Sequence, residues 1–312
     1  MEIFPNTESP NYGSINIIYK NTNFDITTFR RDIKYQDNRL PVKIKYIKNI
    51  KKDLLRRDFT INTLCMDKDG EIIDFLGGRE DIENKIIRTV GNAKTRFEED
   101  SLRILRAIRF STILDFKLDK DVRDAIISCR GLLKNLSYYR KKEELDKIFG
   151  SSRAKDGISL LLDLGLDKFL DLDRLKDVTS TNSLIGVWSV LNVTDKYPFN
   201  SNEKQLIKEI NLVLKLNNTD PVALYTHGLY VNSVAGEIKG INIKKITDSY
   251  NKLVIQSKKD LKITSDDIMA LLDRKPGSYL KDIYADIERE VLYRRLSNDK
   301  KSISKYIIDK YK

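Results

Sequence analysis

The hydrophobic pattern of the chain changes near residue 81, and this change constrains the fold more than any other feature of the sequence. Before it, short runs of β-branched and aromatic residues alternate with turn-forming residues. After it, apolar residues recur at the three- and four-residue spacing of helices, over 95–115, 119–130, 141–150, 155–165 and further segments to residue 312. The sequence therefore predicts a small β-containing part followed by an all-helical remainder.

Two runs in residues 14–29 are rich in isoleucine, threonine and phenylalanine, and the polar segment Lys20–Asn23 separates them. Turn-forming residues between β-branched and aromatic residues are typical of a hairpin. Asp25 interrupts the second run, and a single carboxylate in a strand usually lies on the solvent side. The sequence therefore predicts a β-hairpin with Asp25 on its exposed face.

The next segment, Arg30–Pro41, is polar, charged and without periodicity, which predicts a mobile loop. Apolar residues alternate with lysines over 42–46, the pattern of a strand with one buried face. Residues 53–65 fit a short helix, and Asp69–Gly70 is a turn signal for a second hairpin. The pair Gly77–Gly78 marks a hinge or a close approach of two backbones.

The composition favours an anionic partner and a cytoplasmic location. A net charge of +11 makes nucleic acid the first candidate, although lysine-rich usage is also a form of genome bias. No apolar run approaches the roughly 20 residues of a membrane helix, and no signal peptide is visible, so no membrane association is expected. Cys65 and Cys129 lack CxxC spacing and read as buried thiols in a reducing compartment.

One segment of the helical part, Arg96–Phe110, combines apolar and charged residues at helical spacing. Its apolar side carries Leu102, Leu105, Ile108 and Phe110. Its polar side carries Glu99, Asp100, Arg103, Arg106 and Arg109. A carboxylate and an arginine on one face suit the recognition of a nucleobase edge, where an acceptor meets an amino group and a fork of donors meets a ring nitrogen and a carbonyl. The alternative is a solvated face of ion pairs that supports the helix.

Three motifs follow one another in the chain: Arg56-Arg-Asp-Phe-Thr-Ile-Asn62, Asp74-Phe-Leu-Gly-Gly-Arg-Glu-Asp-Ile82 and Arg96–Phe110. In this order they resemble the class II tRNA nucleotidyltransferase and bacterial poly(A) polymerase family, which includes the CCA-adding enzymes. The resemblance extends to Phe24–Asp32 and Tyr35–Pro41 and, near the C-terminus, to Ile263–Met269 and Lys275–Leu280. It therefore covers nearly the whole chain.

The resemblance implies an α+β fold with four parts. A truncated nucleotidyltransferase head with a small mixed or antiparallel sheet spans residues 1–82, and all-α parts follow: a nucleotide-selecting neck (83–152), a body (153–255) and a tRNA-binding tail (256–312). It also implies the addition of CMP and AMP to the tRNA 3′ end (CCA addition), with CTP and ATP as substrates, Mg²⁺ as cofactor and tRNA as partner.

The same resemblance implies roles for individual residues. Arg57 and Asn62 would contact the triphosphate and the sugar, while Asp100 and Arg103 would pair with the incoming base as a protein template. Arg106 and Arg109 would complete the nucleotide site, with Glu99 as an orienting partner. A flexible loop would carry Asp32, Asp37 and Arg39, and Gly77–Gly78 would form the junction between head and neck.

The carboxylates that such chemistry needs are the main departure from the family. Two metal ions require clustered carboxylates, which the family supplies from an Arg-Asp strand motif and an Asp-x-Asp pair. Neither motif precedes Asp25, which matches only a third acidic position, so the metal ligands stay unknown. We therefore expect this chain to be inactive alone. An exposed sheet edge predicts poor solubility, or assembly with a separately encoded N-terminal fragment.

Two smaller departures and several alternatives remain. Tyr139 stands where the family commonly has Glu, and Leu40 replaces an arginine of the flexible loop. The alternatives within the family are CC addition, A addition and poly(A) addition; the retained loop with Asp32, Asp37 and Arg39 favours an enzyme that handles A. Outside enzymes, the chain would be a non-catalytic tRNA-binding remnant, or the C-terminal part of a split enzyme.

Overall fold

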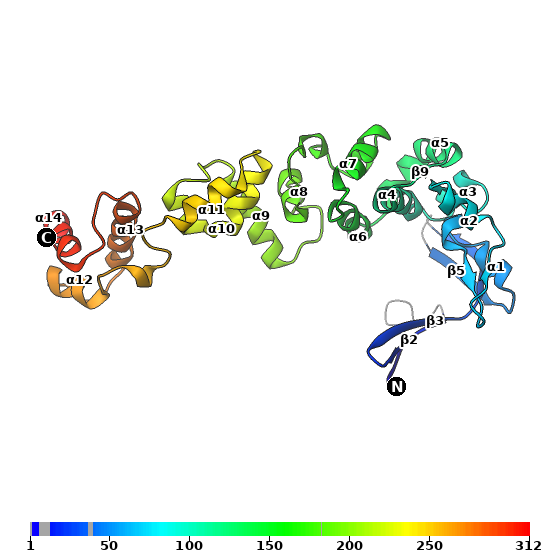
Figure 1. Ribbon diagram of the computed structural model, residues 1–312, viewed down its shortest axis with the longest axis horizontal. Coiled ribbons are helices and arrows are strands. Elements are labelled where there is room, and N and C mark those ends of the chain that lie inside the picture. Colours follow the sequence, from blue (N-terminus) through cyan, green and yellow to red (C-terminus); the bar gives the residue numbers. More distant parts are fainter. Residues whose placement is uncertain (1, 6–12, 37–39, 182) are drawn as a thin grey trace. The chain divides into compact units, whose positions relative to one another are not determined.

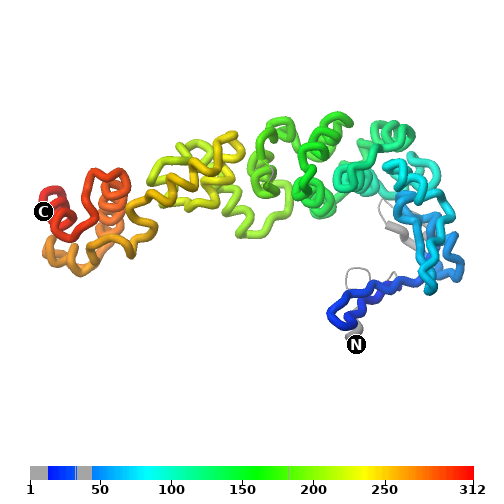
Figure 2. Tube along the Cα trace, viewed as in Figure 1, coloured from blue at the N-terminus to red at the C-terminus, as the bar shows by residue number. Residues whose placement is uncertain are grey.

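The computed structural model describes residues 2–5, 13–36, 40–181 and 183–312. The chain forms two compact units, Met1–Lys176 with Asp195–Pro198, and Asp177–Thr194 with Phe199–Lys312. Strands are concentrated at the N-terminal end and helices follow to the C-terminus, as the ribbon and the tube show from blue to red (Figure 1, Figure 2). The predicted α+β class is confirmed. The division into four parts stays a prediction.

The N-terminal strands β1 (Glu2–Pro5), β2 (Ser14–Tyr19) and β3 (Thr22–Thr27) form an antiparallel sheet in that order. The predicted hairpin is confirmed, although its turn is two residues long rather than four. Lys20 and Asn21 have φ of 46° and 60°, the left-handed pair that a two-residue turn requires. Asp25 pairs with Asn16 across the sheet and is exposed, as expected.

The predicted loop over Arg30–Pro41 is wrong at both ends. Strand β4 (Arg30–Gln36) pairs antiparallel with β5 (Leu40–Tyr46), so Asp32 lies in a strand. Asp37 and Arg39 lie outside the described residues. The charged side chains concealed the strand, because pairing with β5 provides backbone hydrogen bonds that no pattern within residues 30–36 reveals.

The helix predicted over residues 53–65 is also wrong. Helix α1 (Ile50–Leu54) begins earlier, because the side chain of Asn49 accepts the N–H of Lys52 as an N-cap. A 3-10 turn (Thr60–Asn62) follows. Strands β6 (Cys65–Met66) and β7 (Ile72–Ile73) then form the predicted second hairpin.

The glycine pair brings two backbones together, as predicted. Gly77 has φ of 74° and precedes α2 (Gly78–Glu83). A Cβ added to Gly78 would lie 2.3 Å from the carbonyl oxygen of Thr60. Only glycine fits this contact without displacing the 3-10 turn.

Five helices complete the first unit: α3 (Ala93–Glu99), α4 (Leu102–Leu114), α5 (Lys120–Cys129), α6 (Tyr138–Phe149) and α7 (Ala154–Asp163). The short parallel strands β8 (Ile86–Ile87) and β9 (Lys117–Leu118) correct the prediction of an all-α neck. They pair because the chain leaving α4 returns beside residues 85–87, whose carbonyls accept the N–H groups of Lys117 and Asp119. Further 3-10 turns span Arg130–Asn135, Asp167–Phe169 and Leu175–Asp177.

Helical periodicity runs through Arg96–Phe110, but the segment is two helices and not one. Asp100 has extended φ and ψ of −149° and 103°, and its Oδ1 accepts the N–H of Leu102 at 3.1 Å. This local bond competes with the helix and starts α4 afresh. Phe97, Leu105 and Ile108 are buried on either side of the break, each contributing about 1.5–3 kcal/mol of transfer free energy. The break places Asp100 between two anchored helices.

The second unit is entirely helical in its described residues: α8 (Leu184–Leu191), α9 (Ser201–Val213), α10 (Pro221–Ile238), α11 (Ile243–Asn251), a 3-10 turn (Lys258–Asp260), α12 (Ser265–Leu272), α13 (Tyr279–Leu292) and α14 (Lys300–Tyr311). Trp188 is 1% exposed and packs edge-on against Phe199, so it lies in the core of this unit. Within the described ranges, no helix is both long and apolar enough to cross a membrane.

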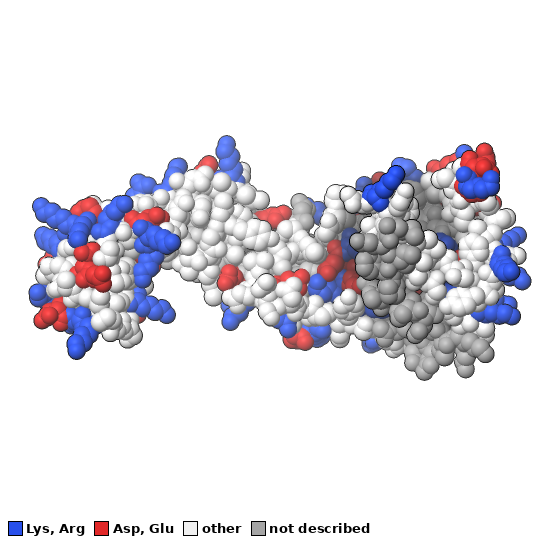
Figure 3. Space-filling view, turned by 90° about the horizontal axis from the view of Figure 1, so that it is seen from below, with Lys and Arg blue, Asp and Glu red and all other residues white. Residues whose placement is uncertain are grey.

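Charged side chains are dense over the last three helices, at the left of Figure 3. Residues 256–312 carry 14 lysines and arginines against 10 aspartates and glutamates. One buried carboxylate, Asp286 on α13, accepts hydrogen bonds from Tyr306, Lys310 and Tyr311 of α14. Helix α14 is therefore held by hydrogen bonds to Asp286 as well as by the packing of its apolar face.

Both cysteines are free thiols. Cys129 is buried as predicted, whereas Cys65 is partly exposed because β6 lies at the surface hairpin.

Candidate functional site

The break between α3 and α4 gathers three of the predicted site residues. Glu99 ends α3, Asp100 forms the break, and Arg103 lies in the first turn of α4. The Glu99 Oε2 accepts the Nη1 of Arg103 at 2.8 Å, and Arg103 also donates to the carbonyls of Arg96 and Arg56, both at 3.0 Å. Arg103 is only 7% exposed. Its guanidinium is therefore fixed in one orientation by a charge and two carbonyls.

Asp100 is the less constrained partner at the break. Its Oδ1 accepts the Leu102 N–H, and within the described ranges no hydrogen bond reaches its Oδ2. Burial raises the pKa of its carboxyl, although Arg103, Arg140 and Arg106 act against that rise. A partly desolvated carboxylate with an unused oxygen can accept a hydrogen bond from a ligand.

A second group of predicted residues surrounds Asp58. Its Oδ1 accepts the Asn62 amide at 2.9 Å, and its Oδ2 accepts the Nε of Arg106 at 2.6 Å. Arg57 donates to the carbonyl of Asn62 at 3.0 Å, and its side chain is 41% exposed. The Asp58 carboxylate thus brings Asn62 and Arg106 together, while Arg57 is attached through the Asn62 carbonyl and faces solvent.

Burial and hydrogen bonding act in opposite directions on Asp58. Burial alone would raise its carboxyl pKa, but Arg106, the Asn62 amide and the Phe59 N–H outweigh burial, and the pKa is lowered. Asp58 is therefore an anion that holds Arg106 and Asn62 in place at neutral pH.

Arg109 has different surroundings from Arg103 and Arg106. It pairs with Glu144 of α6 at 3.1 Å, and its guanidinium lies 4.4 Å from the centre of the Phe110 ring. Burial lowers its pKa, against the effect of Glu144. The three arginines thus have three different carboxylate partners, because their side chains diverge around α4. Of the alternative, a helix face of ion pairs, the described residues show the pairs of Glu99 with Arg96 and Arg103.

The remaining predicted residues lie elsewhere or are not described. Asp25 accepts a hydrogen bond from Asn16 within its own hairpin at 3.0 Å. The strand of Asp32 is described but its side chain is not, and Asp37 and Arg39 lie outside the described residues. The contacts of the flexible-loop residues therefore stay predictions.

The predicted magnesium ions do not fit the residues described. Mg²⁺ requires several oxygen ligands in close, nearly octahedral arrangement. Asp25 is one exposed carboxylate, and in the described part of the chain no three His, Cys, Asp or Glu side chains gather as a metal site would need. We therefore assign no step to a metal ion and leave the metal ligands unknown.

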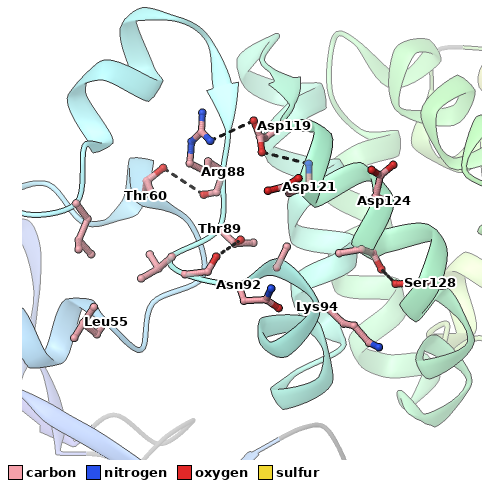
Figure 4. A pocket seen from close by; sticks show the side chains of 15 residues that line it. Leu55, Thr60, Arg88, Thr89, Asn92, Lys94, Asp119, Asp121, Asp124 and Ser128 are labelled. Atoms are coloured by element: carbon pink, nitrogen blue, oxygen red, sulfur yellow. Dashed lines mark hydrogen bonds and ion pairs between the residues drawn. The ribbon is translucent and has the colours of Figure 1, made fainter.

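A cavity of about 810 Å³ lies beside these groups but excludes the predicted site residues. Figure 4 shows Thr60 and Arg88 on one side of the cavity and Asp121 and Asp124 of α5 on the other, with Asp119, just before α5, joined to Arg88. Arg88 forms ion pairs with Asp81 and Asp119. The cavity wall includes Leu55 and Val90, whose carbonyl oxygens accept hydrogen bonds from Arg96 on the side of the α3–α4 break.

Sequence reasoning missed three residues that organise these groups: Asp58, Arg96 and Glu144. Asp58 and Arg96 are both present in the motifs that carried the resemblance. Their roles were not visible in the sequence, because their partners are more than 40 residues away. Asp58 binds Arg106, and Arg96 binds the carbonyl of Leu55. The partner of Glu144, Arg109, is also distant in sequence and lies on another helix.

Comparison with known proteins gives matches along most of the chain. A family model described as the poly A polymerase head domain matches residues 3–88. One described as a probable RNA and SrmB-binding site of polymerase A matches residues 115–172, and one described as a putative tRNA nucleotidyltransferase domain 2 matches residues 196–307.

Individual proteins are similar over nearly the full chain. A CCA-adding enzyme of Geobacillus sp. (strain WCH70) is 30% identical, and the alignment covers 99% of this chain and 85% of that protein. The crystal structure of the Bacillus stearothermophilus CCA-adding enzyme in complex with CTP superimposes with a TM-score of 0.85 at 25% identity, covering 99% of this chain and 84% of that one. The Thermotoga maritima CCA-adding enzyme complexed with tRNA shares the fold, with a TM-score of 0.68 at 19% identity and coverage of 100% and 81%.

Proposed function

The chain belongs to the family of CCA-adding enzymes, which are tRNA nucleotidyltransferases, and on that premise we propose that Asp100 and Arg103 select the incoming nucleotide. The observation that carries the proposal is the α3–α4 break, where Asp100 keeps one carboxylate oxygen without a hydrogen bond from a described residue, beside an arginine fixed by Glu99. An orientation fixed before the ligand arrives lowers the cost of recognition.

The chemistry of the four bases fits this pair. Cytosine and adenine present an amino group beside a ring nitrogen that accepts a hydrogen bond. Uracil and guanine present the reverse, a carbonyl beside a ring N–H. A carboxylate accepts from the amino group and a guanidinium donates to the ring nitrogen, so Asp100 and Arg103 match CTP and ATP. With UTP or GTP the base carbonyl would face the Asp100 carboxylate and the ring N–H would face the Arg103 guanidinium. Unpaired polar groups in a buried site weaken binding strongly.

The second part of the proposal concerns the phosphates. Arg57 is the exposed member of the Asp58 group, and its guanidinium is suited to phosphate oxygens. Asp58 holds Asn62 and Arg106 beside it. We assign Arg57 to the triphosphate, Asn62 to the sugar and Arg106 to completing the site. Arg109, engaged with Glu144, contributes through the packing of α6 on α4.

Equilibrium binding of the four nucleoside triphosphates to the purified chain tests the base-reading pair. We expect CTP and ATP to bind more tightly than UTP and GTP. Asp100→Asn replaces a carboxylate acceptor with an amide that also donates, so it should raise the affinity for UTP relative to that for CTP. The control is Asp69→Asn, at an exposed turn where Asp69 pairs with Lys68. An unchanged CTP to UTP ratio in Asp100→Asn would exclude the template role.

The tRNA is proposed to bind the basic tail by phosphate contacts and shape. The excess of basic over acidic side chains in residues 256–312 supports this assignment. The affinity for a tRNA lacking its 3′ terminus should then fall steeply with salt, as counterion release requires. A flat salt dependence would contradict it.

The expectation that this chain alone extends no tRNA stays a prediction. Purified chain, CTP, ATP, Mg²⁺ and a tRNA lacking its terminus should give no product on a sequencing gel. Measurable extension would mean that Asp25 and residues outside the described ranges suffice. Whether a separately encoded fragment assists is tested by adding a lysate fraction or candidate fragment and looking for restored extension.

A further inference from the structure

Arg96 of α3 donates three hydrogen bonds in three directions, two to backbone carbonyls and one to a carboxylate. Its Nε donates to the Val90 carbonyl at 2.7 Å, its Nη1 to Glu99 Oε2 at 2.6 Å, and its Nη2 to the Leu55 carbonyl at 2.7 Å. The side chain is 18% exposed. Bonds this short to a guanidinium are among the stronger ones in proteins. Arg96 therefore joins α3 to the backbone that follows α1.

The same carboxylate oxygen serves a second arginine. Glu99 Oε2 also accepts the Nη1 of Arg103 at 2.8 Å, and the Nη2 of Arg103 donates to the carbonyl of Arg56 at 3.0 Å. Arg96 and Arg103 therefore hold two consecutive carbonyls, those of Leu55 and Arg56, immediately before Arg57. One oxygen of Glu99 links the two arginines.

This arrangement connects the two halves of the nucleotide site. Arg103 is the proposed base-reading arginine and Arg57 the proposed phosphate-binding one. Two guanidiniums and one carboxylate tie the side chain of Arg103 to the backbone that carries Arg57. A displacement of either half would have to break bonds to the other.

We propose that Arg96 is a positioning residue that holds the base-reading pair and the triphosphate-binding backbone in a fixed position relative to each other. A correct base is then required for correct placement of the phosphates. The inference rests on the proposed function and deepens it. Arg96 itself touches neither the base nor the phosphates. Lysine cannot replace it, because a single ammonium group has no planar fork that reaches three acceptors in fixed directions.

The test compares two affinity ratios, CTP to UTP and CTP to CMP, in variants of the full chain. Arg96→Lys should lower both ratios by about tenfold, the effect expected when one charge-assisted hydrogen bond is misplaced. Asp100→Asn should lower only CTP to UTP. The matched control is Arg130→Lys, because Arg130 also binds a carbonyl, that of Leu164, and lies over the ring of Phe169. It should leave both ratios unchanged.

The outcomes separate the inference from the function on which it rests. If the unaltered chain binds all four triphosphates equally, the proposed function fails. If the unaltered chain discriminates but Arg96→Lys changes neither ratio, or changes only one, the coupling is overturned. If circular dichroism shows that Arg96→Lys does not fold, Glu99→Gln takes its place, since it removes the charge that links Arg96 to Arg103. Unchanged ratios in that variant overturn the inference equally.

Discussion

Replacing Asp58 with alanine should loosen the helices that carry the nucleotide-selecting residues. Asp58 is 8% exposed and accepts hydrogen bonds from Arg106, Asn62 and the Phe59 N–H. Its removal leaves a guanidinium without its carboxylate and two donors without acceptors. Breaking a buried charge pair costs about 3–5 kcal/mol, and the partial exposure of Arg106 favours the lower figure, about 3 kcal/mol.

The assay must report on the first unit alone. The single tryptophan, Trp188, lies in the second unit, so its fluorescence would not detect the loss. Hydrogen exchange of peptides from residues 93–114 does report on α3 and α4. A loss of about 3 kcal/mol corresponds to about 100-fold faster exchange, at about 1.4 kcal/mol per factor of ten. The control Asp69→Ala removes an exposed pair and should change exchange less than about twofold.

The pH dependence follows from the lowered pKa of Asp58. A carboxyl whose folded pKa lies below its unfolded value of 3.8 stabilises the fold above that value and loses its effect as pH falls through the folded pKa. The difference in exchange between the native chain and Asp58→Ala should therefore be full at pH 7 and shrink below about pH 4. An unchanged exchange rate for residues 93–114 at pH 7 would refute the assignment of Asp58 as the anion that holds this part of the site.

Three further predictions concern other parts of the molecule. Burial raises the pKa of Asp100, so its ionisation opposes folding as pH rises; Asp100→Asn should slow exchange of residues 93–114 at pH 7, and faster exchange would contradict the desolvation. Gly78→Ala places a methyl group against the Thr60 carbonyl and should destabilise the first unit by about 1–3 kcal/mol in urea-dependent exchange, whereas a neutral effect would mean that the turn relaxes freely. Asp286→Asn should release α14, seen as faster exchange of residues 300–311. Because its hydrogen bonds lower the Asp286 pKa despite burial, acidification of the native chain below about pH 4 should produce the same release.

Residues whose partners are close in sequence were predicted well. The first hairpin, with its turn within Lys20–Asn23, and the second hairpin at Asp69–Gly70 depend on local turn chemistry. The close approach at Gly77–Gly78 was visible because two glycines in succession carry a backbone requirement.

Residues whose partners are distant were predicted poorly. The charged sequence of strand β4 predicts a loop, whereas its pairing with β5 decides its conformation. The break at Asp100 was hidden by an uninterrupted helical pattern, since a single bond from Asp100 to the Leu102 N–H outweighs the pattern. The spacing of Arg103, Arg106 and Arg109 was visible but their partners were not, because Arg103 and Arg106 bind Arg56 and Asp58 of a distant motif and Arg109 pairs with Glu144 of α6.

The sequence alone determined the kind of protein: three ordered motifs predicted a nucleotidyltransferase of the CCA-adding family, and the matches to known enzymes confirm that family. Only the tertiary structure decided how the motifs cooperate. Arg56–Asn62 and Arg96–Phe110 lie about 40 residues apart, and nothing in either motif states that Arg96 and Arg103 bind the carbonyls of Leu55 and Arg56. Backbone carbonyls are the same at every position in a sequence, so a contact to one of them becomes visible only when the chain is folded.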